Sequence, residues 1–244
     1  MTSLDEIPQV DILAIGAHPD DVEVGVGGML CKFAAAGQRT GILDLTQGEM
    51  GTRGTVEERM AEAQAAASIL GVGYRANAGL PDGGIADDFD QRRRLIAYLR
   101  AFGARVVLAP FHADRHPDHE AAHHLVRNTN YLAGLARIDA GQPPHRAANV
   151  YYYRVYGDST PPQVVINISE EFSSKMKALQ AHRSQFHNPD YPGTPTYVSS
   201  EGFWKSIQTR AEYWGQRIGA EYAETLYALE PIALDTLPGI ETTS

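Results

Sequence analysis

The sequence predicts an α/β protein with a Rossmann-like, mostly parallel sheet, helices on both faces and a C-terminal extension. Up to residue 133, short apolar runs alternate with longer segments of helical pattern, and this alternation places a crossover helix between successive parallel strands. After residue 148 the pattern changes to tyrosine-rich and β-branched strands followed by two helices. A length of 244 residues suits one large domain, so we expect residues 1–244 to form a single domain.

The parallel half is expected to begin with a buried strand at 10–17, because VDILAIGA is a continuous apolar run. The segment 25–36 has a helical pattern that ends at Gly37. The segment 56–71 is amphipathic, and Gly71 suits its C-terminal cap. The other expected elements of this half are strands at 40–46, 74–80 and 104–111, helices at 90–102 and 118–133, and a Gly-rich loop at 48–55.

The C-terminal extension is expected to contain both strands and helices. NVYYYRVYG (149–157) and PQVVINI (162–168) have the pattern of edge or antiparallel strands. Helices are expected at 170–186 and 203–219, with a long loop at 187–199 between them. The sequence contains no repeat, low-complexity run or linker that would separate this extension from the rest.

The composition excludes several classes of partner. A formal net charge of -9 disfavours binding to phosphate backbones, so no nucleic acid is expected. The N-terminus lacks a basic segment, and no apolar stretch approaches the ~20 residues of a membrane span. Cys31 is the only cysteine, which leaves no disulfide framework and no CxxC metal site. We therefore expect a cytoplasmic enzyme, in which five of the nine histidines fall between His112 and His124.

Two short segments of similar pattern follow strands of the expected sheet. HPDD (18–21) comes directly after the first strand, and HPDH (116–119) follows the strand at 104–111. Ligands of an open parallel sheet bind beyond the carboxyl ends of its strands, and proline disfavours helix at the residue before it. The chain can then turn into the next helix, so that the first and fourth residues of each segment lie on the same side. The side chains expected to meet are His18, Asp21, His116 and His119, with Asp20 and Asp118 near them.

Such a cluster of imidazoles and carboxylates favours a catalytic zinc site. These sites commonly use three nitrogen or oxygen ligands and keep a position for water, and two imidazoles plus one carboxylate would meet that need. Asp20 is placed to accept the proton of the water, because it adjoins Asp21 and successive side chains seldom point the same way. The structural alternative is that Asp20 and Asp21 only cap the next helix, but the second segment at a matching strand end favours the metal.

Two further motifs offer rival interpretations. HEAAH (119–123) fits H-E-x-x-H, in which His119 and His123 would bind zinc and Glu120 would be the base. This segment is expected in the first turn of a helix, where such a site would lack its usual mid-helix support, and the alternative leaves HPDD without a role. His123 and His124 are therefore expected to support the metal ligands or to pack in the interior. The glycines of GVGG (25–28) do not match the spacing of a nucleotide-binding loop, and tight packing near the metal is their expected role.

Several stretches of the sequence resemble the LmbE/PIG-L family of zinc N-acetylglucosaminyl deacetylases. They are HPDDVEVGVGG (18–28), TQGEMGTRGTVEERMAEA (46–63), GLPDGG (79–84), HPDH (116–119) and HRSQF (182–186). The resemblance is strongest to the branch that acts in bacillithiol synthesis and deacetylates N-acetylglucosaminyl malate. Members of that branch often form hexamers, so the resemblance implies a homo-oligomer with a small amino-sugar substrate.

The resemblance implies a role for each residue of the two segments. Asp20 would be the general base. His116 would stay off the metal and stabilise the oxyanion or donate a proton, with Asp118 orienting it. One zinc ion per chain would be bound by three ligands: His18, Asp21 and His119.

The substrate-binding residues are expected among arginines and tyrosines around this cluster. Arg59 matches an arginine that lines the active site of the family. Arg53, in the Gly-rich loop, is expected to reach the rim and to bind the carboxylates of a malate aglycone, since arginine offers a bidentate fork. Tyr191 and Tyr197 are the candidates for a tyrosine of the C-terminal loop that helps polarise the amide. Inositol and a second sugar are the alternative aglycones.

Two other functions would use part of the same pattern. Two histidines and one carboxylate also suit a non-haem iron oxygenase, but that triad usually sits in a β-barrel. A metal-dependent glycan-binding protein without turnover would have no need of the free carboxylate of Asp20 beside the metal. Acetate release from an N-acetylglucosaminyl substrate distinguishes both from a deacetylase.

Overall fold

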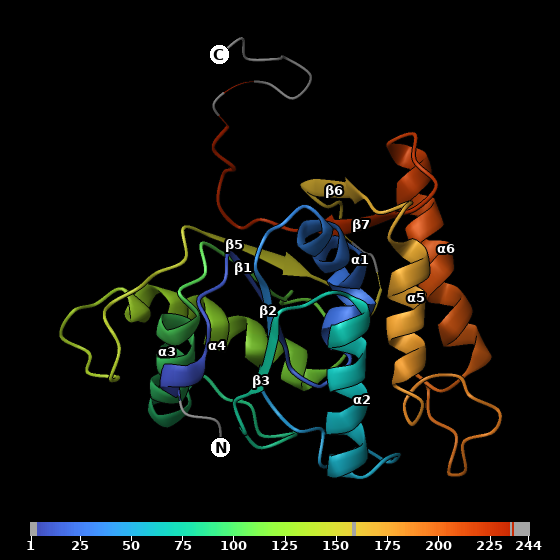
Figure 1. Ribbon diagram of the computed structural model, residues 1–244, viewed down its shortest axis with the longest axis horizontal. Helices are drawn as coiled ribbons and strands as arrows, with labels where there is room; N and C mark the ends of the chain where they lie inside the picture. The colour runs from blue at the N-terminus through green and yellow to red at the C-terminus, as the bar shows by residue number, and fades with distance from the viewer. Residues whose placement is uncertain (1–3, 158–159, 235, 237–244) are drawn as a thin grey trace.

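A five-stranded parallel sheet forms the centre of the protein (Figure 1). The computed structural model describes residues 4–157, 160–234 and 236. The strands stand in the order β3-β2-β1-β4-β5, and each neighbouring pair is parallel. The order reverses between β1 and β4, and such a switch point opens a crevice for ligands. The five strands are β1 (Ile12–Gly16), β2 (Thr40–Asp44), β3 (Tyr74–Asn77), β4 (Val106–Pro110) and β5 (Asn149–Tyr153).

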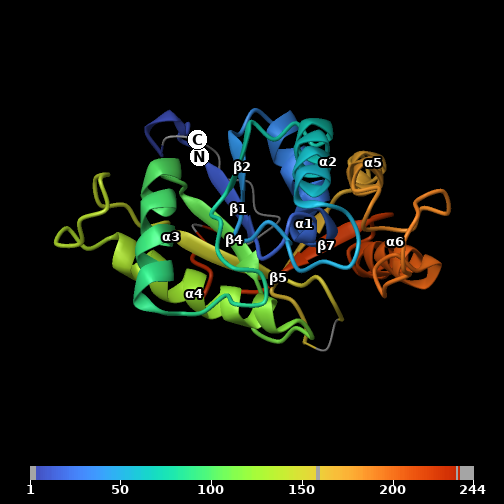
Figure 2. The same cartoon turned by 90° about the horizontal axis from the view of Figure 1, so that it is seen from below.

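Helices cover both faces of this sheet (Figure 2). On one face α3 (Phe89–Phe102) packs against α4 (Pro117–Ala133). On the other face lie α1 (Asp21–Ala35) and α2 (Val56–Ile69), and α5 (Phe172–Ala181) packs on both of them. Successive residues of each strand point to opposite faces, so the strands contribute to two separate hydrophobic cores. The predicted α/β class with a mostly parallel sheet is confirmed.

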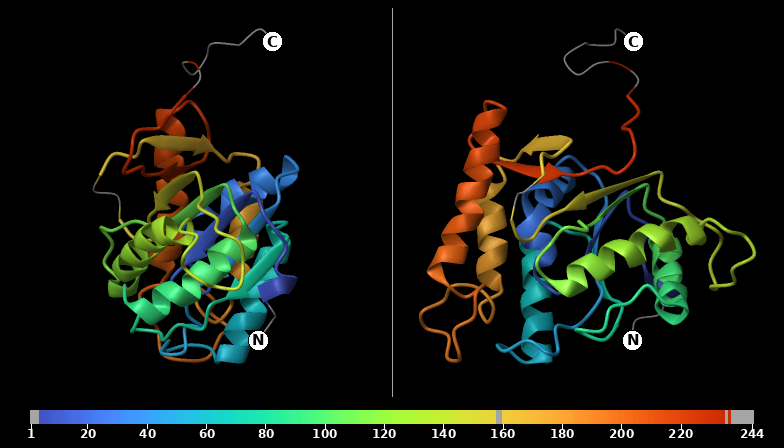
Figure 3. Two further views of the ribbon diagram at one scale, coloured as in Figure 1. Left: turned by 90° about the vertical axis from the view of Figure 1, so that its left-hand side faces the viewer. Right: turned by 180° about the vertical axis from the view of Figure 1, so that it is seen from behind.

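The C-terminal extension adds a small second sheet and α6 (Glu201–Arg217) (Figure 3). β6 (Val164–Asn167) pairs antiparallel with β7 (Ala223–Leu226), and a bridge between Tyr152 and Tyr227 joins this region to β5. β7 was not expected from the sequence. No helix of the described part of the chain is long and apolar enough to cross a bilayer.

Two helix boundaries differ from the expected ones by several residues, and one short element was not expected. α1 begins at Asp21, four residues before the expected start, because the segment after the His-Pro pair enters the helix at once. α5 ends at Ala181, and residues 182–186 form a turn that carries Ser184 and Gln185 towards the Gly-rich loop. A short 3₁₀ helix at Leu4–Glu6 was not expected.

α1 is interrupted at Val26, whose φ of -141° and ψ of 18° are not helical. The interruption frees backbone groups that charged side chains of the C-terminal extension then satisfy. Lys175 donates to the carbonyl of Val24 at 2.8 Å. The carboxylate of Glu224 accepts from Gly28 N at 2.9 Å and from Met29 N at 2.7 Å. The extension therefore fixes the helix that begins at Asp21.

Gly25 lies where α1 meets β5, and we expect its replacement by alanine to destabilise the fold. A Cβ at Gly25 would lie 2.1 Å from Cδ2 of Tyr153, a fully buried ring whose hydroxyl donates to Ile15 O. We expect Gly25→Ala to lower the free energy of unfolding by about 1–3 kcal/mol, although alanine favours a helix by ~1 kcal/mol over glycine. Urea denaturation measures the change.

Gly27→Ala is the matched control, since a Cβ there meets its nearest atom at 3.7 Å. We expect this variant to be as stable as the wild type or more stable. Equal stability of both variants would contradict the packing role of Gly25.

Candidate functional site

The HPDD and HPDH segments meet at the carboxyl ends of the adjacent strands β1 and β4. β1 ends at Gly16, and α1 begins at Asp21. His116 caps the N-terminus of α4, with its ring nitrogen Nδ1 accepting from Asp118 N at 3.2 Å, and Pro117 occupies the first turn. Because β1 pairs directly with β4, both segments face one crevice.

Four side chains of these segments form a tight, mostly buried cluster. The ring of His116 lies 4.7 Å from that of His18 and 4.9 Å from that of His119, centroid to centroid. The Asp21 carboxylate lies between two of the rings, with Oδ2 3.4 Å from His18 Nδ1 and Oδ1 3.1 Å from His119 Nε2. The structure thus brings together the four residues that the sequence predicted to meet.

The electrostatics of this cluster keep the Asp21 carboxylate ionised. Burial alone would raise the pKa of Asp21, but the charges and hydrogen bonds of His119 and His18 hold that pKa well below its usual range. Burial would lower the pKa of His119, yet the charge of Asp21 and the hydrogen bonds to Asp114 and Asp21 raise it to about 9. The pKa of His18 is raised as well, so the rings of His18 and His119 carry protons that a metal ion would displace.

The donor set of this cluster fits a divalent metal ion. Ring nitrogens of His18, His116 and His119 all lie within 4.8 Å of one another, and Asp21 contacts two of these rings. Two ligands that are 2.0–2.2 Å from a tetrahedral zinc ion lie roughly 3.3–3.6 Å apart, close to the contacts of Asp21 with His18 and His119. Neutral imidazole and carboxylate oxygen are also the ligands of catalytic zinc.

Asp82 contacts the cluster, although it was not expected there from the sequence. Its Oδ1 lies 3.1 Å from His18 Nε2, and its Oδ2 accepts from Met50 N at 2.8 Å. Asp82 belongs to the PDGG turn beyond β3, another carboxyl end of the sheet. This position beyond a strand end could have marked Asp82 as a site residue. A PDGG sequence is common in turns, however, and so does not by itself indicate a site.

Asp114 is a second site residue that was not expected from the sequence, and it contacts His119, His116 and Tyr156. Its Oδ1 lies 3.1 Å from His119 Nδ1 and accepts from His116 N at 3.1 Å. Its Oδ2 accepts from Tyr156 N at 3.3 Å. A carboxylate on the outer nitrogen of a histidine fixes the orientation and tautomer of the ring.

Asp118, which was expected to orient His116, contacts that ring through its backbone N–H, while its carboxylate faces other partners. The Asp118 carboxylate lies 3.3 Å from His18 Nε2 and accepts from Gly83 N at 2.8 Å. Only the backbone N–H of Asp118 reaches His116. Since α4 starts at Pro117, this carboxylate belongs to the first helical turn and points towards β1.

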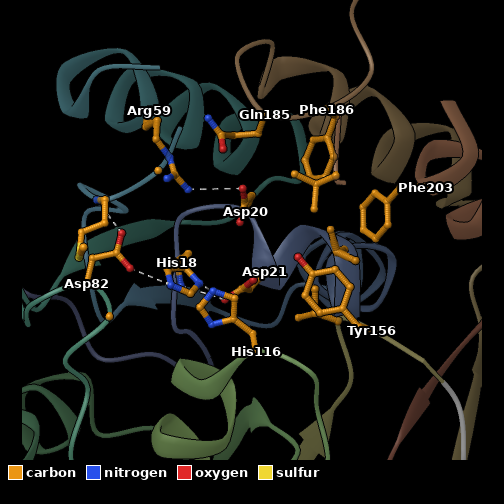
Figure 4. A pocket seen from close by; sticks show the side chains of 16 residues that line it. His18, Asp20, Asp21, Arg59, Asp82, His116, Tyr156, Gln185, Phe186 and Phe203 are labelled. Atoms are coloured by element: carbon orange, nitrogen blue, oxygen red, sulfur yellow. Dashed lines mark hydrogen bonds and ion pairs between the residues drawn. The ribbon is translucent and has the colours of Figure 1, made fainter. Parts of the chain in front are cut away.

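Asp20 and Arg59 lie side by side above the cluster (Figure 4). Arg59 Nη2 is 3.5 Å from Asp20 Oδ2, and Arg59 Nη1 donates to Gly48 O at 2.7 Å. Both side chains line the cavity described next. Asp20 therefore points away from the contacts of Asp21, as the sequence analysis expected of successive side chains.

A cavity of about 290 Å³ opens over the cluster. In Figure 4 the polar groups Asp20, Arg59 and Asp82 lie across the cavity from aromatic side chains of the C-terminal extension. A site that joins a few convergent polar groups to an apolar wall is typical of small-ligand binding. The cavity is lined by His18, Asp20, Asp21, Val24, Met50, Gly51, Arg59, Asp82, Gly83, His116, Val155, Tyr156, Gln185, Phe186, Val198 and Phe203.

Three predicted substrate-binding residues do not line this cavity. Arg53 is buried, and its Nε donates to Ser184 O at 2.6 Å while its guanidinium lies over the ring of Tyr191. The hydroxyl of Tyr191 donates to Glu58 Oε2 at 2.7 Å. Tyr197 is 55% exposed and lines the neighbouring hollow instead. The tyrosine that lines the cavity is Tyr156, beyond β5.

His123 takes no part in the cluster. Its Nδ1 lies 3.1 Å from Pro110 O, and its ring packs among Phe111, His112 and Tyr152. Burial is the main cause that lowers the pKa of His123 to about 4. This packing agrees with the expected role of His123 and not with an H-E-x-x-H site.

Comparisons with known proteins agree on one family. Residues 13–130 match the family model described as PIG-L: GlcNAc-PI de-N-acetylase. Diacetylchitobiose deacetylase of Thermococcus kodakarensis is 28% identical over 242 residues, which cover 93% of this chain and 86% of the relative. The Bacillus anthracis protein named Probable N-acetyl-alpha-D-glucosaminyl L-malate deacetylase 2 is 28% identical over 189 residues, which cover 72% of this chain and 81% of the relative.

A solved structure resembles the whole chain. The conserved protein TT1542 from Thermus thermophilus is 38% identical and superposes with a TM-score of 0.86. The match covers 96% of this chain and 100% of the other.

Proposed function

Because this chain belongs to the PIG-L/LmbE family of deacetylases, we propose that it is a zinc-dependent enzyme that removes the acetyl group of an N-acetylglucosaminyl conjugate. The observation that carries this proposal is the ionised, buried Asp21 carboxylate between two imidazoles, at the base of a cavity that Asp20 also lines. Protonated rings of His18 and His119 compensate this carboxylate in the metal-free protein, and a divalent metal ion can take the place of these protons.

The proposed metal ligands are His18, Asp21 and His119. Asp21 contacts both of the other two, and each of the two histidines has a carboxylate on its remaining ring nitrogen. Asp118 and Asp82 contact His18 Nε2, and Asp114 contacts His119 Nδ1. When bound, the metal ion supplies Lewis-acid activation of a water molecule and of the acetyl carbonyl.

Asp20 is the proposed general base. It lines the cavity beside the cluster, and among the described residues its carboxylate contacts Arg59 and none of the proposed ligands. Its carboxylate accepts the proton of the attacking water and returns it to the leaving amine as the C–N bond breaks. The guanidinium of Arg59, held by Gly48 O, fixes the direction of that carboxylate. The products are acetate and a free glucosaminyl amine.

His116 is the proposed donor to the oxyanion of the tetrahedral intermediate. In the metal-free protein, burial, followed by the charges of His18 and His119, lowers the pKa of His116. Its Nδ1 accepts from Asp118 N, so the proton of the neutral ring is on Nε2. His116 can therefore donate an N–H to the cavity without first gaining a charge.

For the aglycone we propose malate, on the resemblance of the sequence to the bacillithiol branch. A panel of N-acetylglucosaminyl compounds that differ only in the aglycone tests the function. The panel contains the malate conjugate, the inositol conjugate, diacetylchitobiose and the methyl glycoside, with acetate release as the measurement. Absence of acetate release from every member would contradict the deacetylase.

The contact of Asp114 with His119 predicts a loss of metal affinity. We expect Asp114→Asn to weaken zinc binding about 10- to 100-fold, because asparagine no longer supplies a charge to the ring and keeps one acceptor oxygen for the two backbone N–H groups of His116 and Tyr156. Competition with a chelator of known affinity measures the change. Asp139→Asn is the control, since Asp139 also accepts a backbone N–H, from Gly141, in an exposed loop. An affinity equal to that of the wild type would exclude this role of Asp114.

A further inference from the structure

Four ionisable side chains that take no part in the proposed reaction are buried together behind the first turn of α1. They are Glu23 of α1, Asp44 of β2, Arg75 of β3 and His182 at the end of α5. The side chains of Glu23, Asp44 and His182 are 0% exposed, and that of Arg75 is 2% exposed. Charged groups are costly to bury unless they are paired, so the contacts within this group decide what it does.

Arg75 pairs with both carboxylates of the group. Its Nε and Nη2 donate to the two oxygens of Asp44 at 2.7 and 2.9 Å, and its Nη1 donates to Glu23 Oε1 at 2.5 Å. Burial alone would raise the pKa of Glu23, but the neighbouring Arg75, followed by His182, lowers it to about 2. Glu23 is therefore an ionised carboxylate that Arg75 holds in place.

His182 contacts the same carboxylate from the end of α5. Its Nε2 lies 3.1 Å from Glu23 Oε1. An ionised carboxylate can only accept, so the ring nitrogen that faces it carries the proton. In the part of the chain that the structure describes, the other ring nitrogen, Nδ1, has no hydrogen-bond partner. The orientation of the His182 ring thus depends on Glu23.

The backbone of His182 is bonded to a wall of the proposed catalytic cavity. Its carbonyl oxygen accepts from Gln185 N at 3.0 Å and from Phe186 N at 3.2 Å. Gln185 and Phe186 both line the cavity, and in Figure 4 they lie across it from His116. His182 therefore connects this wall, through its backbone, to the helix of Asp20, through its ring.

The other polar contacts of the 182–186 turn lead to different elements. Ser184 N and Oγ donate to the carboxylate of Glu62 on α2 at 2.8 and 2.7 Å. Gln185 Nε2 donates to Arg53 O in the Gly-rich loop at 2.7 Å. Among the described residues, the ring of His182 supplies the one polar side-chain contact between this turn and α1.

We propose that His182 is a positioning residue, which holds the cavity wall of Gln185 and Phe186 against the first turn of α1 through its contact with Glu23. This inference rests on the proposed deacetylase function, in which the wall contacts the substrate. Because Arg75 still holds Glu23 when the contact is lost, the carboxylates of α1 should keep their places. Substrate binding should weaken, while zinc affinity and turnover should change little.

Two amide substitutions test the contact. In His182→Gln the amide nitrogen can take the place of Nε2, whereas in His182→Asn it reaches only the place of Nδ1. We expect His182→Asn to raise KM for N-acetylglucosaminyl malate about 10- to 100-fold, with kcat and zinc affinity within about threefold of wild type. His182→Gln should restore KM. His145→Asn is the control, since this half-buried ring contacts Ala104 O and does not line the cavity.

His182→Phe is a second variant, because it keeps a ring in the buried space and removes the contact with Glu23. The same rise in KM is expected, so the test does not depend on the folding of one variant. A KM equal to that of wild type in either His182→Asn or His182→Phe overturns the inference. An equal rise in His182→Gln and His182→Asn also overturns it, because the contact would then not be the cause.

A measurement without catalysis separates this inference from the function on which it rests. If wild type releases no acetate, amide hydrogen exchange at residues 185 and 186 still reports whether the wall is held, since these N–H groups donate to His182 O. Faster exchange in His182→Asn than in wild type and His182→Gln supports the positioning role. Equal exchange in all three proteins overturns it.

Discussion

Asp20→Asn is expected to lower kcat by roughly 10²–10⁴ while the protein still binds one zinc ion per chain. Asparagine keeps the size of the side chain but cannot accept a proton. The Asp20 carboxylate contacts Arg59 and none of the proposed metal ligands, so the change leaves the metal contacts of Asp21 in place. Steady-state acetate release and metal analysis of the same preparation measure both properties.

Asp90→Asn, at an exposed position of α3, is the control for this substitution and should match the wild type. Loss of zinc from Asp20→Asn would make Asp20 a ligand rather than the base. Full turnover with zinc retained would require another group to accept the proton.

Lys175→Met is expected to lower the free energy of unfolding by about 3–5 kcal/mol. Lys175 is 2% exposed and lies 2.6 Å from Glu224 Oε1, and it donates to the carbonyl of Val24 that the interruption of α1 leaves free. Methionine fills much of the volume but leaves the buried carboxylate without its cation, and it removes the shorter of the two hydrogen bonds to the carbonyl, the other being donated by Arg210 Nη2 at 3.5 Å. Urea denaturation of the metal-free protein measures the loss.

A second substitution separates the ion pair from packing. Glu224→Gln added to Lys175→Met removes the unpaired charge, so the double variant should be more stable than the sum of the two single losses predicts. Lys205→Met is the matched control, because the pair of Lys205 with Glu201 is exposed and should contribute less than about 1 kcal/mol. A loss of less than about 1 kcal/mol in Lys175→Met would contradict the stabilising role of the buried pair of Lys175 with Glu224.

The sequence predicted the parallel sheet and the histidine cluster because both depend on local signals. Apolar runs mark β1, β2 and β4, and the two H-P-D segments follow strands that the topology makes neighbours. β7 escaped prediction because its pattern, AETL, is short, and its pairing with β6 depends on residues about sixty positions away.

The site residues that were misplaced or missed also depend on contacts between distant parts of the chain. Arg53 was expected at the rim, but Gly48 and Gly54 turn the Gly-rich loop with positive φ angles, and Arg53 packs on a turn more than a hundred residues later in the chain. Asp82 and Asp114 lie in loops without periodicity. Their contacts with His18 and His119 follow from tertiary structure alone.

Metal-dependent acetate release tests the central claim most directly. Protein stripped by a chelator and dialysed would be assayed with N-acetylglucosaminyl malate before and after addition of one equivalent of zinc. The account predicts no acetate release from the stripped protein, recovery with zinc, and no recovery in His119→Ala. Acetate release at the full rate by the metal-free protein would contradict it.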